Sequence, residues 1–138
     1  MKKATAILII LALLHFTSFA QIKIAADSIP ALLCKQWIAD YAMIGNMKID
    51  KLPGTPTPDY QFKEDKTVIM GSLQSKDKTT GTWAYDNNKK IIKIIINGKV
   101  NSMIVSLTAT ELIMLFDTKQ VTPDDDMAMR LIYKLKQE

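Results

Sequence analysis

Histidine and cysteine are almost absent from this sequence, which has one His and one Cys among 138 residues. A single Cys cannot form a disulfide within the chain, and so few thiol and imidazole groups exclude a zinc site built from several Cys and His ligands. Nucleophilic and acid–base catalysis most often depends on His, so the composition leaves little room for enzymatic chemistry. The chain length predicts one domain at most.

The first twenty residues have the pattern of a secretory signal peptide. Lys2 and Lys3 precede an apolar run over 4–14, and the small residues Ser18 and Ala20 occupy the two positions that a signal peptidase reads. The sequence therefore predicts a signal peptide over 1–20, a domain over 21–138, and export to the periplasm or the extracellular space. The apolar run is shorter than the roughly 20 residues that a membrane-spanning helix needs, and no later segment reaches that length.

Removal of the predicted signal peptide lowers the net charge of the chain and removes its only histidine. His15 is lost with Lys2 and Lys3, which leaves 16 basic residues where the whole chain has 18, against the same 14 acidic residues. A nearly neutral domain is a poor match for the phosphate backbone, so we expect no nucleic-acid partner. The expected product is a soluble exported protein without His.

Cys34 and the acidic residues suggest neither a catalytic nor a metal site. Cys34 lies in an apolar stretch and lacks both the small preceding residue and the position of a lipid-modified cysteine, so we expect a small buried side chain. No pair of carboxylates is placed in an apolar pocket by the pattern. The acidic run over 124–126 follows Thr122 and Pro123, which is typical of a helix start rather than of a calcium loop. We expect no metal, no cofactor and no enzymatic activity.

The chain after residue 35 alternates short apolar segments with turn residues. A capping residue and Pro30 predict a brief helix over 27–33. Asn97-Gly98 is the most specific turn signal, because both central residues of a type I′ turn have positive φ. The loops between segments are too short for crossover helices, so neighbouring strands pair antiparallel. The eight expected strands are 35–44, 60–63, 67–73, 79–86, 90–96, 99–107, 111–117 and 129–136.

Eight short antiparallel strands fit either an up-and-down barrel or a sandwich. One set of alternate residues is large and apolar along most strands, while the opposite set, which includes Ser102 and Lys93, is polar. A meander with one dry face closes naturally into a barrel, which also removes exposed edges. We therefore expect an all-β fold, an eight-stranded antiparallel barrel with a short N-terminal helix. The residues expected to face inward are Trp83, Tyr85, Ile92, Ile94, Ile96, Met103, Val105, Leu107, Leu112, Met114, Phe116, Met129, Leu131, Tyr133 and Leu135.

Short motifs around the two tryptophans resemble the small exported lipocalin-like domains of bacteria. Leu33-Cys34-Lys35-Gln36-Trp37 opens the first strand, and Gly81-Thr82-Trp83 lies in the fourth. The resemblance implies a barrel that binds small apolar molecules, in which an Arg near the chain end packs across the first Trp at the closed base. It therefore suggests a cation–π pair of Trp37 with Arg130, the only arginine. Lys35 stands where the family has Gly.

Two functions follow from such a barrel. In the first, the barrel holds a small hydrophobic or amphipathic ligand against Trp83, Tyr85, Met103, Met114 and Tyr133, with methionines supplying an adaptable lining. In the second, side chains fill the barrel and the protein acts as an interaction or cell-envelope structural module, with protein partners bound through the loops over 54–59 and 121–127. The stiff Pro-rich loop over 52–58 resembles a lid over the barrel mouth. The volume of the interior discriminates between the two functions.

Overall fold

A computed structural model describes residues 21–50, 57–72, 75–116 and 128–137. A turn of 3₁₀ helix, η1 (Ala26–Ser28), leads into the short helix α2 (Ile29–Leu33). Pro30 stands in the first turn of α2, where a missing N–H costs nothing. The strands that follow are β1 (Gln36–Ile44), β2 (Met47–Ile49), β3 (Asp59–Phe62), β4 (Thr67–Gly71), β5 (Thr79–Asp86), β6 (Ile91–Ile96), β7 (Lys99–Leu107), β8 (Glu111–Phe116) and β9 (Arg130–Leu135).

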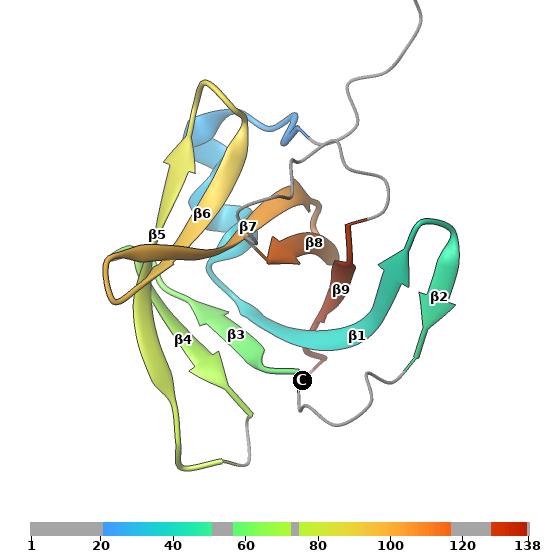
Figure 1. Cartoon of the computed structure of the whole chain (residues 1–138). Helices are drawn as coiled ribbons and strands as arrows, with labels where there is room; N and C mark the ends of the chain where they lie inside the picture. Colours follow the sequence, from blue (N-terminus) through green and yellow to red (C-terminus); the bar gives the residue numbers. More distant parts are fainter. Residues whose placement is uncertain (1–20, 51–56, 73–74, 117–127, 138) are drawn as a thin grey trace, which may run out of the picture.

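The strands form a closed antiparallel barrel (Figure 1). Each strand from β3 to β9 pairs with its neighbour in the chain, and β9 pairs with β1 over Trp37 to Met43, which closes the circle. Eight strands make the wall, because β2 pairs only with the end of β1, outside the circle. The predicted eight-stranded barrel with a short N-terminal helix is confirmed.

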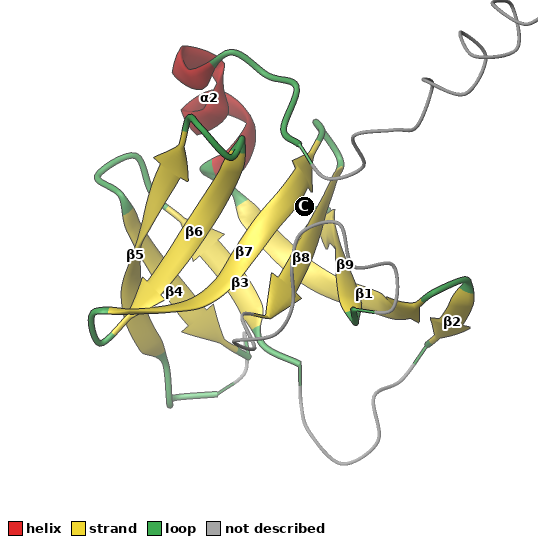
Figure 2. Cartoon of the chain, turned by 45° about the horizontal axis from the view of Figure 1, so that its top comes forward, coloured by secondary structure: helices red, strands yellow, loops and turns green. Residues whose placement is uncertain are grey.

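The segment β2 is the one strand of the described chain that the sequence pattern did not predict. Both β2 and β3 pair antiparallel with β1, β3 at Gln36 and Trp37 and β2 from Ala42 onward. A two-residue turn with Gly45 at φ 56° joins β1 to β2, and the hairpin projects beyond the barrel wall (Figure 2). Three residues with little burial carry too weak an alternation to stand out as a strand.

The barrel interior holds the main hydrophobic core. Trp37, Trp83 and Tyr133 are its largest side chains, and each is at most 1% exposed. The inward positions predicted on β5, β6, β8 and β9 belong to this core or pack against it, except Met129, which precedes β9 and is 36% exposed. Asn97 and Gly98 both have positive φ, as the predicted turn between β6 and β7 requires.

The prediction for β7 was wrong in part. Met103 lies opposite Lys93 of β6 and belongs with Val105 to a second apolar cluster, on the outer face of β6, β7 and β8. Ser102 instead faces inward and is fully buried. The register of β7 shifts twice, against β6 and against β8, and each bulge changes which residues face inward. The second shift returns Leu107 to the core.

One end of the barrel, here called the helix end, is covered by α2 (Figure 2). Ile29 and Leu33 of α2 join the core, and the backbone N–H of Ile22 donates to the carbonyl of Lys90 in the β5–β6 turn at 2.8 Å. The indole N–H of Trp37 donates to the carbonyl of Leu33 at 3.0 Å. These contacts attach the helix to the barrel wall beside Trp37.

The predicted packing of Arg130 across Trp37 was wrong. Along the β1–β9 pair, Trp37 lies opposite Leu135 while Arg130 lies opposite Met43, so the two residues occupy opposite ends of the barrel. The guanidinium Nη2 donates to the carbonyl of Gly45 at 3.0 Å, in the turn before β2. The sequence contains an Arg on the last strand, but at the first residue of that strand rather than near its end.

Among the residues that the structure describes, no helix is long and apolar enough to span a bilayer. The predicted signal peptide over 1–20 lies outside the described residues, as do the acidic run over 124–126, the loop over 121–127 and most of the Pro-rich loop.

Candidate functional site

The barrel interior contains three buried hydroxyl groups among apolar side chains. They belong to Tyr60 of β3, Ser102 of β7 and Tyr133 of β9, and we call them the hydroxyl cluster. Tyr60 is 1% exposed, and Ser102 and Tyr133 are 0% exposed. Alternation along each strand directs the three side chains inward, Ser102 through the bulges of β7. Sequence analysis identified only Tyr133 of the three.

Two members of the cluster have no hydrogen-bond partner of ordinary geometry. The Tyr60 hydroxyl and the Ser102 Oγ are both buried and unpaired, whereas the Tyr133 hydroxyl donates to the carbonyl of Pro58 at 3.1 Å. Burial raises the pKa of Tyr60 to about 12, and the Ser102 hydroxyl, which lies within reach of the Tyr60 oxygen but not in hydrogen-bond geometry, opposes this rise. Burial, and then the neighbouring Tyr60 and Asp59, raise the pKa of Tyr133 as well. Both phenols are therefore protonated at neutral pH.

Aromatic contacts hold the two tyrosines in place. The rings of Tyr60 and Tyr133 meet edge to face with their centroids 5.4 Å apart, and Tyr60 stacks on Phe62 at 5.9 Å. Such pairs stabilise the fold beyond simple burial by about 0.5–1.5 kcal/mol each. The hydroxyl of Tyr60 is thus fixed by its ring, although it lacks a partner of its own.

The end of the barrel opposite α2, here called the far end, has an apolar rim. Met70 at the end of β4, Ile96 at the end of β6 and Phe116 at the end of β8 pack on the core but remain partly exposed. The Tyr133 hydroxyl reaches Pro58 at this end, just before β3. The rim residues therefore lie between solvent and the hydroxyl cluster.

The predicted ligand contacts are divided among three places. Met114 and Tyr133 lie fully buried in the interior, where Tyr60 and Ser102 also lie. Trp83 and the half-buried Tyr85 lie toward the helix end. Met103 lies on the outer face and cannot contact a ligand inside the barrel. The structure thus brings two of the five predicted residues together with two that sequence reasoning missed.

The contacts of Trp83 link strand β5 to the β3–β4 turn. Its indole N–H donates to the carbonyl of Lys63 at 2.9 Å, and its backbone N–H donates to the carbonyl of Lys66 at 2.9 Å. The ammonium of Lys66 lies 3.7 Å from the centre of the Trp83 ring. The cation–π pair therefore joins Lys66 to the second tryptophan, rather than Arg130 to the first.

Side chains fill the middle of the barrel. Ile92, Ile94, Ile104, Leu112 and Met114 are all 0% exposed, which means that a water-sized probe does not reach them from outside or from an internal void. Side chains therefore occupy the middle of the described interior. A ligand at the hydroxyl cluster must displace side chains that now occupy the space.

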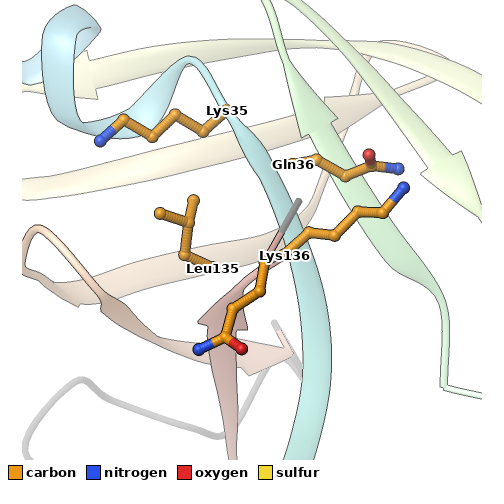
Figure 3. Close-up of a pocket in the computed structure, with 5 residues that line it drawn as sticks. Lys35, Gln36, Leu135 and Lys136 are labelled. Carbon is orange, nitrogen blue, oxygen red and sulfur yellow. The ribbon is translucent and has the colours of Figure 1, made fainter.

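A broad depression of about 730 Å³ lies on the surface at the helix end, between β1 and β9 (Figure 3). The ammonium groups of Lys35 and Lys136 point to opposite sides of the strand pair in this view. The polar groups do not converge on one point, so the depression is a solvated basic surface rather than a defined binding site. Its lining residues are Lys35, Gln36, Leu135, Lys136 and Gln137.

Cys34 is half-buried beside the core, and its thiol is the one free thiol of the described residues. Burial, followed by the charge of Glu64, raises the pKa of the Cys34 thiol, which makes it a poorer nucleophile. Within the described ranges, no three His, Cys, Asp or Glu side chains are grouped so that they could hold a metal ion.

Comparison with family models, with curated proteins and with solved structures found no match to this chain.

Proposed function

We propose that this protein is an exported, non-enzymatic, lipocalin-like binding protein that holds a small hydrophobic or amphipathic molecule inside its barrel. The observation that carries the proposal is the pair of buried, unpaired hydroxyls of Tyr60 and Ser102 in an otherwise apolar interior. Ligand pockets in proteins are mostly apolar, with a few polar groups that orient the bound molecule.

The unpaired hydroxyls reduce the stability of the fold. A buried hydroxyl without a partner costs about 1–3 kcal/mol, and native structures contain few such groups. Ala in place of Ser102 would remove this cost while retaining a small side chain. A polar group that destabilises the fold at a buried position supports a role in binding rather than in folding.

The partly exposed rim residues support ligand entry through the far end of the barrel. Met70 and Phe116 are partly exposed there, and Met114 lies deeper in the core. Methionine side chains change rotamer easily and can repack around a guest molecule. The packed interior is then the ligand-free state, and the ligand shifts the protein toward a conformation in which these side chains have moved aside.

Both phenols support binding rather than proton transfer. With a pKa of about 12, Tyr60 remains protonated at neutral pH and can donate or accept a hydrogen bond without becoming charged. General bases work best with a pKa near the working pH, which neither tyrosine has.

Titration with a neutral fluorescent probe, N-phenyl-1-naphthylamine, tests the proposal. The probe is expected to gain fluorescence in the presence of the protein as it leaves water. Met70→Gln makes the rim polar and is expected to weaken binding about tenfold, because about 1.4 kcal/mol of apolar contact is lost. The matched control is Ile69→Gln, on the neighbouring residue of the same strand, whose side chain points to the outer face. Absence of saturable binding, or equal loss in both variants, would refute the interior site.

A second candidate function is favoured by the packing of the core. The fully buried side chains in the middle of the barrel also suit a solid module that acts through its surface, with protein partners bound by the loops over 54–59 and 121–127. Such a module would bind no apolar probe in its interior. The titration therefore separates the two candidates directly.

A further inference from the structure

We propose that the polar group of the bound ligand is uncharged, a hydroxyl or a similar group that both donates and accepts, and that Tyr60 and Ser102 bind it. This inference rests on the proposed interior binding site. It adds to that proposal the chemical class of the ligand: an alcohol or phenol with an apolar tail, in preference to a fatty acid or an amine.

The two free hydroxyls define what a guest must supply. Each can donate one hydrogen bond and accept others, and neither carries charge. Tyr60 and Ser102 both face the interior, each beside a rim residue, Met70 and Phe116 respectively, and their hydroxyls lie within reach of each other without forming a bond of ordinary geometry, so a single small group could reach both. A ligand hydroxyl placed there would accept from one and donate to the other, which would satisfy both buried groups.

The surrounding charges disfavour an anionic ligand. Asp59 is the acidic group that acts on the cluster: it adds to the rise in the pKa of Tyr133, and its Oδ1 accepts from the backbone N–H of Ala39 at 3.2 Å. A carboxylate inside the barrel beside Tyr133 would meet this negative charge, and none of the Lys and Arg side chains that the structure describes is buried in the interior to balance it. Burying an unpaired charge costs several kcal/mol.

The cations on the neighbouring described strands lie on the outer face of the barrel, and Lys78 lines a shallow surface depression together with Asp59. Arg130 lies opposite Leu115, which is part of the outer cluster, and its guanidinium donates to the carbonyl of Gly45. Lys93 lies opposite Met103 on the same face and pairs with Asp86 at 2.7 Å. Lys134 likewise pairs with Asp40 at 3.0 Å. Among the described residues, the buried side chains of the interior are apolar except for Ser102 and the two tyrosines.

Three probes with the same tail and different head groups test the inference: 1-octanol, octanoate and octylammonium at pH 7. Binding is measured by calorimetry, and the site by amide chemical shifts in NMR spectra. Octanol is expected to bind, and the two charged probes are expected to bind at least about tenfold more weakly, because their heads lose solvation without gaining a partner.

Two variants test whether the hydroxyls contact the head group. Ser102→Ala and Tyr60→Phe should each weaken octanol binding roughly three- to tenfold, the value of one hydrogen bond. Ser106→Ala and Tyr41→Phe are matched controls, since they remove the same groups from residues that pair with the outward-facing Ile113 and Ile132. Ser102→Ala should also melt at the same temperature as the parent or higher, whereas a residue with a purely structural role would lower the melting temperature.

The outcomes separate this inference from the function on which it rests. If none of the three probes binds, the interior site itself is refuted. If octanoate or octylammonium binds as tightly as octanol, the interior site stands and the uncharged head is refuted. Octanol affinity that is unchanged in both hydroxyl variants would also overturn the assignment of Tyr60 and Ser102.

Discussion

Gly81 on β5 occupies a position where the barrel leaves no room for a side chain. A Cβ atom there would lie 2.4 Å from the backbone oxygen of Ile95 and 2.4 Å from the Cδ1 of Ile96. Ile96 is one of the rim residues, and its side chain covers Gly81 from inside the barrel. The backbone φ of Gly81 lies outside the left-handed region, so its backbone conformation does not require glycine. The close approach of the neighbouring strand requires it instead.

Gly81→Ala is expected to destabilise the protein by about 1–3 kcal/mol, since the backbone of β6 cannot move aside as a flexible side chain could. Chemical denaturation monitored by circular dichroism measures the change. Gly98→Ala is the comparison: there is open space around Gly98, but its φ of +74° makes Ala cost about 1–2 kcal/mol through backbone strain alone. A Gly81→Ala variant as stable as the parent would contradict the tight contact.

Residue-level prediction from sequence succeeded where alternation was regular. Ile92, Ile94 and Met114 were placed correctly. The pairing of β6 with β5 and the pairing of β8 with β9 contain no register shift, so simple alternation gives the right face. Ser102 and Met103 were exchanged between faces, because β7 is apolar on both sides and its two bulges cannot be read from residue types. The polar part of the candidate site was missed for this reason.

Among the elements, the β3–β4 turn is fixed to β5 through Trp83. The carbonyls of Lys63 and Lys66, at the two ends of this turn, accept from the indole and backbone N–H groups of Trp83. The ammonium of Lys66 then lies over the face of the ring. The side chain of Trp83 thus holds the β3–β4 turn against β5 at the helix end.

Trp83→Phe is expected to lower the free energy of unfolding by about 2 kcal/mol, through the lost indole hydrogen bond and the weaker contact with Lys66. Lys66→Met separates the contribution of the cation–π contact from that of the indole hydrogen bond, because it removes only the charge above the ring. It is expected to lower the free energy of unfolding by about 0.5–1 kcal/mol. Thermal and urea unfolding of both variants provide the measurement. Equal losses in the two variants would show that the hydrogen bond to Lys63 contributes nothing.

The elements themselves were largely predictable. The expected strands 79–86 and 99–107 match β5 and β7, and the others differ from the observed strands by one or two residues at their ends. β2 was missed because its pairing depends on the length of β1, which continues beyond the barrel wall. The pairing of Trp37 with Arg130 failed for a related reason: the family pattern gives residue types, whereas the register of β9 against β1 places Arg130 at the far end.

At the scale of the whole molecule, the barrel closes around tyrosine side chains that remain neutral. The free energy of unfolding is therefore expected to fall at alkaline pH. The pKa of Tyr60 is raised to about 12 from an ordinary value of 10.0, and that of Tyr133 is raised further. A group whose pKa is higher in the folded state contributes stability that is fully present below its unfolded pKa and is lost as pH rises.

We therefore expect the protein to lose stability between pH 10 and 12, by about 2–3 kcal/mol for Tyr60 alone, since unfolded tyrosines ionise while the buried ones cannot. Tyr60→Phe should flatten the stability profile in this range. Denaturation at a series of alkaline pH values tests the slope, and Tyr41→Phe, on the outer face, is the control. A profile that is the same in Tyr60→Phe and the parent would refute the burial of this phenol.

Both tryptophans are buried, at 0% and 1% exposure, but they have different neighbours: Trp37 pairs directly with Tyr60 of the hydroxyl cluster, whereas Trp83 is bound to the β3–β4 turn at the helix end. The intrinsic fluorescence of the protein therefore reports on both regions. Blue-shifted emission that persists while a ligand enters would show that the two indoles stay buried as the far end opens. Emission that moves to the red with ligand would show that opening extends from the rim to the tryptophans, so fluorescence measures how far a ligand-induced rearrangement spreads through the barrel.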